Sequence, residues 1–342
     1  MVRSSATPPH VSVIICHHVG RTLITRCLES VYLSQGVSYE VLVVTSDGTF
    51  EHPQATVLYE QGGPAHKRNV GTVRSQAKTV VYLDDDVEIS PYCLYQFWLW
   101  LKEHPRCGMA FAKIYKMEEG RRDEFDDAGS WLTWTGFLWA RAGNGQCDNG
   151  QFGEPRRCLS SKSATCGVRR EAFQRVGGFD RDYYILGEET DLAWRCWLKG
   201  YEVWYVPTAV SWHAFGCESL KPKADYYTIR RTMTYGCRNY LSLLWTNLGT
   251  ARFTIIFPLH LSAWLVASVG FCLRGDNRRG MAVLRGLQEF SSRLPTLLRK
   301  RSRVQSTRVV SDRTLFRHIY YHPHFSYYLT RMYRYLTTQL HG

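Results

Sequence analysis

The sequence predicts an α/β fold, in which a mainly parallel sheet flanked by helices is followed by a basic helical region. Three observations predict it. Short apolar runs, typical of buried strands, alternate with segments whose apolar residues recur at helical spacing. The chain has 342 residues, of which 44% are hydrophobic, and this is ample for a core. The net charge of +13 is concentrated near the carboxyl end.

Composition divides the chain into three parts. Residues 1–10 are polar and contain prolines, and they are expected to form a flexible amino terminus without the apolar core of a signal peptide. Residues 11–220 carry the alternating strands and helices. Residues 221–342 form the basic helical region, which includes an apolar segment at 253–273.

The predicted strands of the amino-terminal half are short and apolar. They are expected at residues 10–16, 39–44, 56–59 and 80–83, with helices at 23–33 and, after a Gly-Gly-Pro turn, at 66–77. Strands that alternate with helices form parallel pairs, so their carboxyl ends meet at one edge of the sheet. Open α/β sheets bind their ligands at that edge.

The pattern continues less regularly after residue 90. Helices are expected at 93–101 and 170–176 and again from residue 188, and strands at 109–114 and at 202–206, where Pro207 ends the second one. The aromatic segment 131–141 reads as a strand or a hairpin. Its aromatic rings belong either to the core or to a wall for a sugar or lipid acceptor.

Three consecutive carboxylates follow the buried run at 80–83, namely Asp84, Asp85 and Asp86. Adjacent carboxylates repel one another, so a positive group should compensate them, most simply a divalent cation that bridges a phosphate. A solvated acidic turn is the alternative. Because only alternate residues of an extended segment point the same way, Asp84 and Asp86 are expected to face a ligand. Asp85 is then expected to point elsewhere, toward a structural hydrogen bond.

A second acidic cluster follows Gly187, where Glu188, Glu189 and Asp191 lie in the first turn of a predicted helix. Carboxylates there either compensate the helix dipole or supply a general base for catalysis. Further along, His213 lies at the exit of a strand, where a histidine is either structural or a metal ligand.

Seven of these segments occur in an order that resembles the family 2 glycosyltransferases of the GT-A fold, a Rossmann-like α/β fold. In chain order they are VSVII, EVLVV with Asp47-Gly48, GPAHKRNVG, YLDDD, VGGFD, GEETDL and YVPTAVSWH. The resemblance covers residues 11 to about 216. The basic helices of the tail resemble the appendages of bacterial rhamnosyltransferase-like members.

This resemblance implies an enzyme that takes a sugar from a nucleotide donor, usually with inversion at the anomeric carbon. The candidate donor-binding residues that it implies are Asp47, Arg68, Asn69, Asp84 and Asp85. Asp86 would bind Mg²⁺ or Mn²⁺ across the diphosphate, with His213 as a further ligand. Glu189 stands where the family usually has the aspartate that deprotonates the acceptor hydroxyl.

Two positions depart from the family pattern. The base position is Glu189 rather than the commoner aspartate, so its reach differs by one methylene, and Glu188 or Asp191 would be able to share its work. After the second strand the usual acidic pair is replaced by Thr45-Ser46-Asp47, which changes the expected contact with the donor base.

The apolar segment 253–273 is uncharged apart from a titratable His260, and 21 residues are just enough to span a bilayer. Pro258, Ser262 and Ser268 lower its hydrophobicity, so the segment spans a membrane, lies in its interface or packs as a buried helix. Residues 274–317 carry 12 Arg and Lys against three acids. Such a stretch suits anionic headgroups, and no nucleic-acid-binding motif accompanies it.

The sequence thus predicts a glycosyltransferase at the cytoplasmic face of the cell membrane, peripheral or anchored through 253–273. It would move one sugar from a UDP-, dTDP- or GDP-sugar to a hydroxyl of a lipid-linked or cell-envelope glycan. The scattered cysteines, 11 in number and without a CxxC pair, fit a reducing compartment. The alternatives are a processive polysaccharide synthase and a non-catalytic nucleotide-sugar-binding membrane scaffold.

Overall fold

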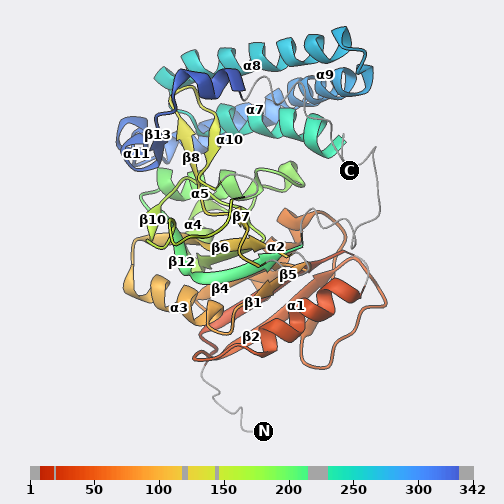
Figure 1. The fold of residues 1–342 in the computed structure, drawn as a ribbon, viewed down its shortest axis with the longest axis vertical. Helices are drawn as coiled ribbons and strands as arrows, with labels where there is room; N and C mark the ends of the chain where they lie inside the picture. Colours follow the sequence, from red (N-terminus) through yellow and green to blue (C-terminus); the bar gives the residue numbers. More distant parts are fainter. Residues whose placement is uncertain (1–7, 19–20, 118–121, 143–145, 215–229, 331–342) are drawn as a thin grey trace.

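The computed structural model of the chain describes residues 8–18, 21–117, 122–142, 146–214 and 230–330. Most of the expected flexible amino terminus and the expected boundary between residues 220 and 221 lie outside this part. The described chain is an α/β structure, in which a large sheet flanked by helices occupies one end and a layer of helices the other (Figure 1). The predicted fold class is confirmed.

The central sheet of the described chain has ten strands. They are β1 (Val11–His17), β2 (Tyr39–Thr45), β3 (Thr56–Tyr59), β4 (Thr79–Asp84), β5 (Val87–Ile89), β6 (Cys107–Lys116), β7 (Phe125–Asp127), β10 (Arg156–Arg157), β11 (Thr165–Arg169) and β12 (Glu202–His213). Their order is β10-β12-β6-β11-β4-β1-β2-β3, with β5 paired to β12 and β7 to β6.

The strand directions are mixed. The four strands of the amino-terminal half form parallel pairs as predicted, and β6 is parallel to β12. Between these two groups, β11 runs antiparallel to both β4 and β6. An apolar run indicates that a strand is buried on both faces, but it does not indicate the direction of the strand. The sequence therefore could not predict that β11 is antiparallel to its neighbours.

Helices cover both faces of the sheet. On one face lie α1 (Thr22–Tyr32) and α3 (Cys93–Glu103), and on the other lie α2 (Pro64–Arg74), α4 (Arg170–Val176) and α5 (Glu188–Leu198). Side chains alternate along β1, so that Val13 and Ile15 pack toward α1 and α3, whereas Ile14 packs toward α2. The strands at the centre of the sheet, such as β1, are therefore buried on both sides, and their carboxyl ends are where a ligand can reach them.

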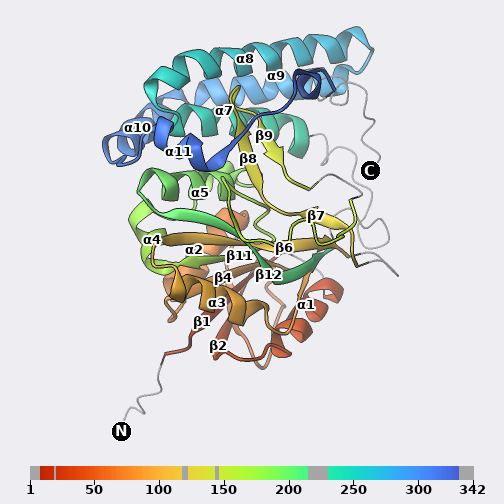
Figure 2. The ribbon, with the colours of Figure 1, turned by 60° about the vertical axis from the view of Figure 1, so that its left-hand side comes forward.

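The helical region begins with a π-helical turn at Arg230–Tyr235. It continues with α7 (Gly236–Asn247), α8 (Thr250–Leu273), α9 (Asn277–Ser292), α10 (Leu294–Ser306) and α11 (Asp312–Ile319). A small sheet of β8 (Ser130–Thr133), β9 (Leu138–Ala140) and β13 (Tyr320–Tyr321) reaches up to these helices. In both views α7 lies against α5, and α8 forms the end of the molecule farthest from the amino terminus (Figures 1 and 2).

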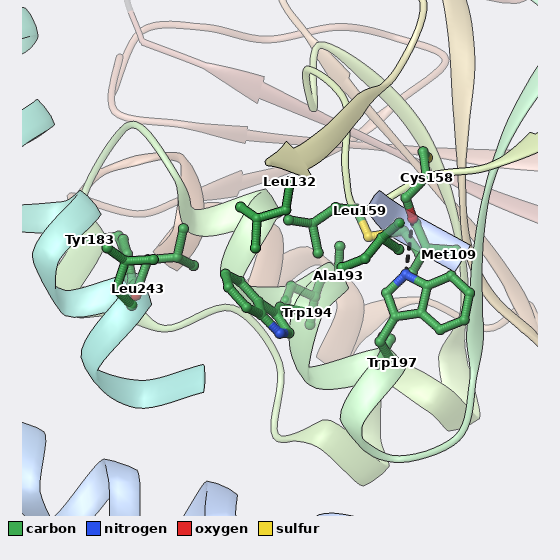
Figure 3. Close-up of a cluster of buried hydrophobic side chains, with 14 of the residues drawn as sticks. Met109, Leu132, Cys158, Leu159, Tyr183, Ala193, Trp194, Trp197 and Leu243 are labelled. Atoms are coloured by element: carbon green, nitrogen blue, oxygen red, sulfur yellow. Dashed lines mark hydrogen bonds between the residues drawn. The ribbon is translucent and has the colours of Figure 1, made fainter. Parts of the chain in front are cut away.

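A continuous apolar core joins the two parts. Trp194 of α5 is fully buried between Leu243 of α7 and Leu132 of β8 (Figure 3). On the next turn of α5, the indole nitrogen of Trp197 donates a hydrogen bond of 2.9 Å to the carbonyl of Cys158. The helix that begins with the second acidic cluster is thus packed between the sheet and the helical region.

The structure decides between the alternatives for one segment and corrects the predicted end of one strand. The aromatic segment at 131–141 is a hairpin, in which β8 pairs with β9. The strand expected to end at Pro207 instead continues to His213, with a break in register, because Val206 pairs with Ala112 and Val210 with Lys113. Pro207 is tolerated since it lies in the bulge, where the partner strand requires no N–H donor.

Candidate active site

The acidic triplet lies where β4 ends at the carboxyl edge of the sheet. Ligand atoms of Asp84, Asp86 and His213 all lie within 4.8 Å of one another. His213 reaches this point because β12 ends beside β5, where it pairs with Val87 immediately after the triplet. Two carboxylates and an imidazole are ligands that Mg²⁺ or Mn²⁺ accepts, so the group fits a divalent cation.

A second carboxylate orients His213. Its Nε2 lies 3.2 Å from Oδ1 of Asp86, and its Nδ1 lies 2.9 Å from Oδ2 of Asp126 in β7, which also binds the ammonium of Lys162. Burial alone would lower the pKa of His213, but the two carboxylates outweigh it and raise the pKa to about 9. A carboxylate that holds one ring nitrogen fixes which nitrogen a metal meets.

Asp85 lies outside this metal-ligating group. Its Oδ2 accepts a hydrogen bond of 3.3 Å from the backbone N–H of His18. Burial, together with the flanking carboxylates of Asp86 and Asp84, raises the pKa of Asp85 to about 7. Asp85 thus lies apart from Asp84 and Asp86 as expected, but not for the expected reason, because β4 ends at Asp84, and Asp85 and Asp86 form the turn before β5. The roles of the three acids stay predictions.

Arg68 connects the two acidic clusters. Its guanidinium, 1% exposed, donates to Oδ1 of Asp84 at 2.8 Å and to Oε1 of Glu188 at 3.0 Å. Burial opposes the charge on Arg68, but Asp84 and the other nearby acidic groups, including Glu188, raise its pKa above the usual value. The edge of β4 and the start of α5 are thus held together by one cation, and Arg68 lies inside the protein.

The acids of α5 have different surroundings. Asp191 is buried, with Oδ2 2.7 Å from the guanidinium of Arg195 and Oδ1 accepting from the amide of Asn247 at 2.9 Å. Glu188 is buried against Arg68. Glu189 is half-buried, and no basic side chain of the described residues forms an ion pair with it. Of the three candidate bases, Glu189 alone has no ion-pair partner in the part of the chain that the structure describes.

Glu189 is consequently hard to ionise. Burial, with the charge of Glu188 as the second cause, raises the pKa of Glu189 from its ordinary 4.5 to about 8. Its Oε1 accepts a hydrogen bond of 3.0 Å from the hydroxyl of Thr190. A carboxylate with a raised pKa in a partly open position suits proton transfer near neutral pH.

The loop before α5 is strained, and α7 holds it in place. Tyr184 and Leu186 have positive φ angles of 61° and 70°. From α7, the amide nitrogen of Asn239 donates to the carbonyls of Tyr183, Ile185 and Leu186 at 2.8–2.9 Å. Strained backbone of this kind persists only where its surroundings enforce it, and it is frequent next to active sites.

The two remaining predicted donor-binding residues, Asp47 and Asn69, both form hydrogen bonds within the protein. Asp47 follows β2, and its carboxylate accepts from the backbone N–H and the hydroxyl of Thr49, which lowers its pKa. Asn69 uses both ends of its amide on the backbone of Phe179 in the Gly-Gly-Phe-Asp loop. The side chain of Asn69 therefore ties α2 to that loop, and donor contacts of Asp47 and Asn69 stay predictions.

Sequence reasoning missed Asp126, Lys162 and Asn239. Asp126 had a weak signal, since it belongs to a pair of acids directly after Phe125. Lys162 and Asn239 had none, because each acts through a partner more than 30 residues away in the chain.

Comparison with known proteins gives the site a context. Residues 79–285 match the model of the family described as glycosyl transferase family group 2. No curated protein sequence matches the chain. The matched residues include the acidic triplet, the α5 cluster, His213 and the helical region as far as the middle of α9.

Several solved structures share the fold. A mannosyltransferase from Pyrobaculum calidifontis, PcManGT, in complex with GDP-Man and Mn²⁺, is 16% identical with a TM-score of 0.53, over 96% of this chain and 85% of that one. TarS residues 1–349 of S. aureus, in complex with UDP-GlcNAc, has the same identity and TM-score over 87% and 83%. GalNAc-T7 with UDP, GalNAc and Mn²⁺ is 16% identical, with a TM-score of 0.50 over 74% of this chain, which spans about half (54%) of that protein.

Proposed function

The chain belongs to glycosyl transferase family group 2 and is a glycosyltransferase of the GT-A fold, and on that premise we propose a metal-dependent, inverting transfer of one sugar. The donor is a nucleotide sugar with a UDP, dTDP or GDP nucleotide. The acceptor is a hydroxyl of a lipid-linked or cell-envelope glycan. The observation that carries the proposal is the Asp84, Asp86 and His213 group, joined through Arg68 to the helix of Glu189.

In this proposal Asp84, Asp86 and His213 hold Mg²⁺ or Mn²⁺. When bound, the cation neutralises the charge that builds on the departing nucleoside diphosphate. The structures of PcManGT and GalNAc-T7, which share the fold, were obtained with Mn²⁺, and this supports the choice of cofactor. Asp126 keeps Nδ1 of His213 occupied, so Nε2 is the nitrogen turned toward Asp86.

Glu189 acts as the general base. Its carboxylate takes the proton of the acceptor hydroxyl while the hydroxyl oxygen attacks the anomeric carbon, and the bond from that carbon to the diphosphate oxygen breaks on the opposite side. Attack from the side opposite the leaving group inverts the anomeric centre. Thr190 donates to one carboxylate oxygen of Glu189, which leaves the other for the acceptor.

The proposal is tested by calorimetric titration of UDP-, dTDP- and GDP-sugars, with Mn²⁺ and with EDTA. At least one donor is expected to bind more tightly with Mn²⁺, and Asp86→Asn is expected to remove that difference. Asp182→Asn is the matched control, because this carboxylate pairs with Lys300 outside the metal group. If no donor binds in a metal-dependent way, the proposed function is wrong. A protein that binds a donor but transfers no sugar to any glycan acceptor is a binding scaffold instead.

A further inference from the structure

The helix α8 has two faces of different character. One face is buried against the protein and consists of Ile256, Phe257, His260, Ala267, Ser268 and Phe271. The polar side chains of this face are bonded internally, since Nε2 of His260 lies 2.8 Å from the carbonyl of Thr135, and the hydroxyl of Ser268 donates to the carbonyl of Gly280 at 2.9 Å. This face of α8 therefore belongs to the protein core.

The opposite face is apolar and exposed. Its large side chains are Ile255, Leu259, Leu265, Val266, Val269 and Leu273, which we call the outer face of α8. Exposed fractions on it reach 70% at Ile255, 60% at Val266 and 83% at Leu273. Steps of three and four residues, with Ser262 in the gap, align most of these positions along one side of the helix. No Asp, Glu, Lys or Arg interrupts the segment 253–273.

The outer face lies at the end of the molecule. In both ribbon views α8 runs along that end, and α7 and α5 separate it from the sheet (Figures 1 and 2). The high exposure of the outer face means that the described residues leave it uncovered. A soluble surface rarely keeps a continuous apolar stripe of this length without an occupant.

Positive charge lies beside the outer face. Exposed Arg274 and Arg278 follow its carboxyl end. Aliphatic side chains followed by exposed arginines are typical of the boundary between acyl chains and headgroups.

We propose that α8 lies in the plane of a membrane, with its outer face against the surface of an anionic lipid bilayer. The helix has the length and composition to cross a membrane. A crossing would, however, strip His260 and Ser268 of their partners and remove one side of the apolar core formed with α7 and α9, which costs more than surface docking.

Charge favours a lipid surface over a second copy of the chain. The net charge of +13 makes two copies repel each other, whereas an anionic bilayer attracts the arginines beside the stripe. The docking surface does not depend on the proposed transfer reaction. It agrees with a lipid-linked acceptor, because such an acceptor is held at a membrane surface.

The test is co-sedimentation of the full chain with vesicles of phosphatidylcholine containing 0 or about 30% phosphatidylglycerol, a range in which surface charge acts on basic residues. The chain is expected to sediment with the anionic vesicles and to be released by salt. Val266→Asp is expected to lower partitioning about tenfold, since it replaces apolar contact with a charge. Arg274→Glu is expected to lower it several-fold.

Two residues of α2 provide matched controls. Val73 is 77% exposed and Arg74 is exposed beside it, so Val73→Asp and Arg74→Glu make the same chemical changes far from α8 and should leave partitioning unchanged. All four sites are on the surface, so the variants are expected to fold, and thermal unfolding checks this.

Four outcomes would overturn the proposal. Two concern the native protein and vesicles: it does not bind anionic vesicles, or it binds neutral vesicles equally well. The third is that the α8 and α2 variants have equal effects. The fourth is that carbonate extraction leaves the native protein in membranes, which indicates a span. A further overturning result is a dimer by light scattering that Val266→Asp converts to a monomer. In that case a second copy of the chain covers the outer face.

Discussion

The two acidic clusters of the site each contain three carboxylates, yet the carboxylates have different partners. In the cluster at 84–86, Asp84 and Asp86 converge with His213 on one small space. In the cluster of α5, Glu188 and Asp191 are each held by an arginine, and only Glu189 has no basic partner among the described residues. The first arrangement pools negative charge, and the second isolates one acid.

The difference separates two chemical tasks. Pooled carboxylates repel one another until a cation joins them, so they favour metal binding. A single half-buried carboxylate without an ion pair of its own keeps a raised pKa, here through burial and the charge of Glu188, and it can exchange a proton. Arg68 belongs to both clusters, since its guanidinium forms an ion pair with Asp84 in the first and with Glu188 in the second.

The largest expected effect comes from Glu189→Gln, which would abolish the isolated acid. Loss of a general base typically lowers kcat by about 10²- to 10⁴-fold. Donor affinity should stay within a few-fold of the native value, and Glu189→Asp should recover part of the rate. Steady-state kinetics and donor titration test this, and an equal loss of donor affinity would place Glu189 in donor binding instead.

The same variant should change how stability depends on pH. The pKa of Glu189 is raised from 4.5 to about 8, so the native state retains a proton that the unfolded state has lost. Stability therefore falls as pH rises through this interval, and Glu189→Gln removes the fall. Thermal unfolding at pH 5 and pH 8 should show that the stability of the variant relative to the native protein is higher at pH 8 than at pH 5. The transfer rate should rise over the same interval. Parallel curves for the two proteins would contradict the raised pKa.

Asp191→Asn should produce the next largest effect, and on stability rather than on chemistry. It leaves the buried Arg195 without its counter-charge, for a cost of about 3–5 kcal/mol. The matched control is Glu171→Gln, because Glu171 and Arg175 form a pair of the same spacing on the surface, worth less than about 0.5 kcal/mol. Denaturant unfolding measures both. Similar costs would show that Asp191 is not the structural member of its cluster.

Asp126→Asn should weaken metal binding without removing a ligand. It disturbs the partner of Nδ1 on His213, and such changes typically cost about 10- to 100-fold in affinity. Mn²⁺ titration tests this, with the exposed Asp123→Asn as the control on the same segment. An unchanged affinity would mean that His213 does not ligate the cation.

The smallest effect should come from Asp85→Asn. Asp85 lies outside the pooled group, and its charge is already opposed by burial and by its neighbours. Its kcat/KM should stay within a few-fold of native, whereas Asp86→Asn should lose most activity. Comparable losses in the two variants would refute the division of the triplet.

Much of this arrangement was predictable because it follows from local patterns. The apolar runs located the strands, and the polar residues after them located the edge at which Asp84, Asp86 and His213 meet. The counter-ions were not predictable in the same way. Arg68 and Glu188 are 120 residues apart in the chain, and nothing local indicates which acid an arginine will neutralise. The two faces of α8 also depend on packing, since the segment is apolar all round in sequence.

The break in register on β12 has a consequence for how the chain tolerates change in length. Three residues of β12, from Pro207 to Ala209, have no counterparts on β6, and His213 follows four positions beyond them. The face on which His213 lies is set by the pairs beyond the bulge, with Lys116 of β6 and Val87 of β5. A change of length inside the bulge can therefore leave the histidine in place, because the bulge residues pair with nothing on β6. A slip of one residue in the pairing after Val210 would instead turn His213 to the opposite face, so this pairing is the feature to align when related sequences are compared.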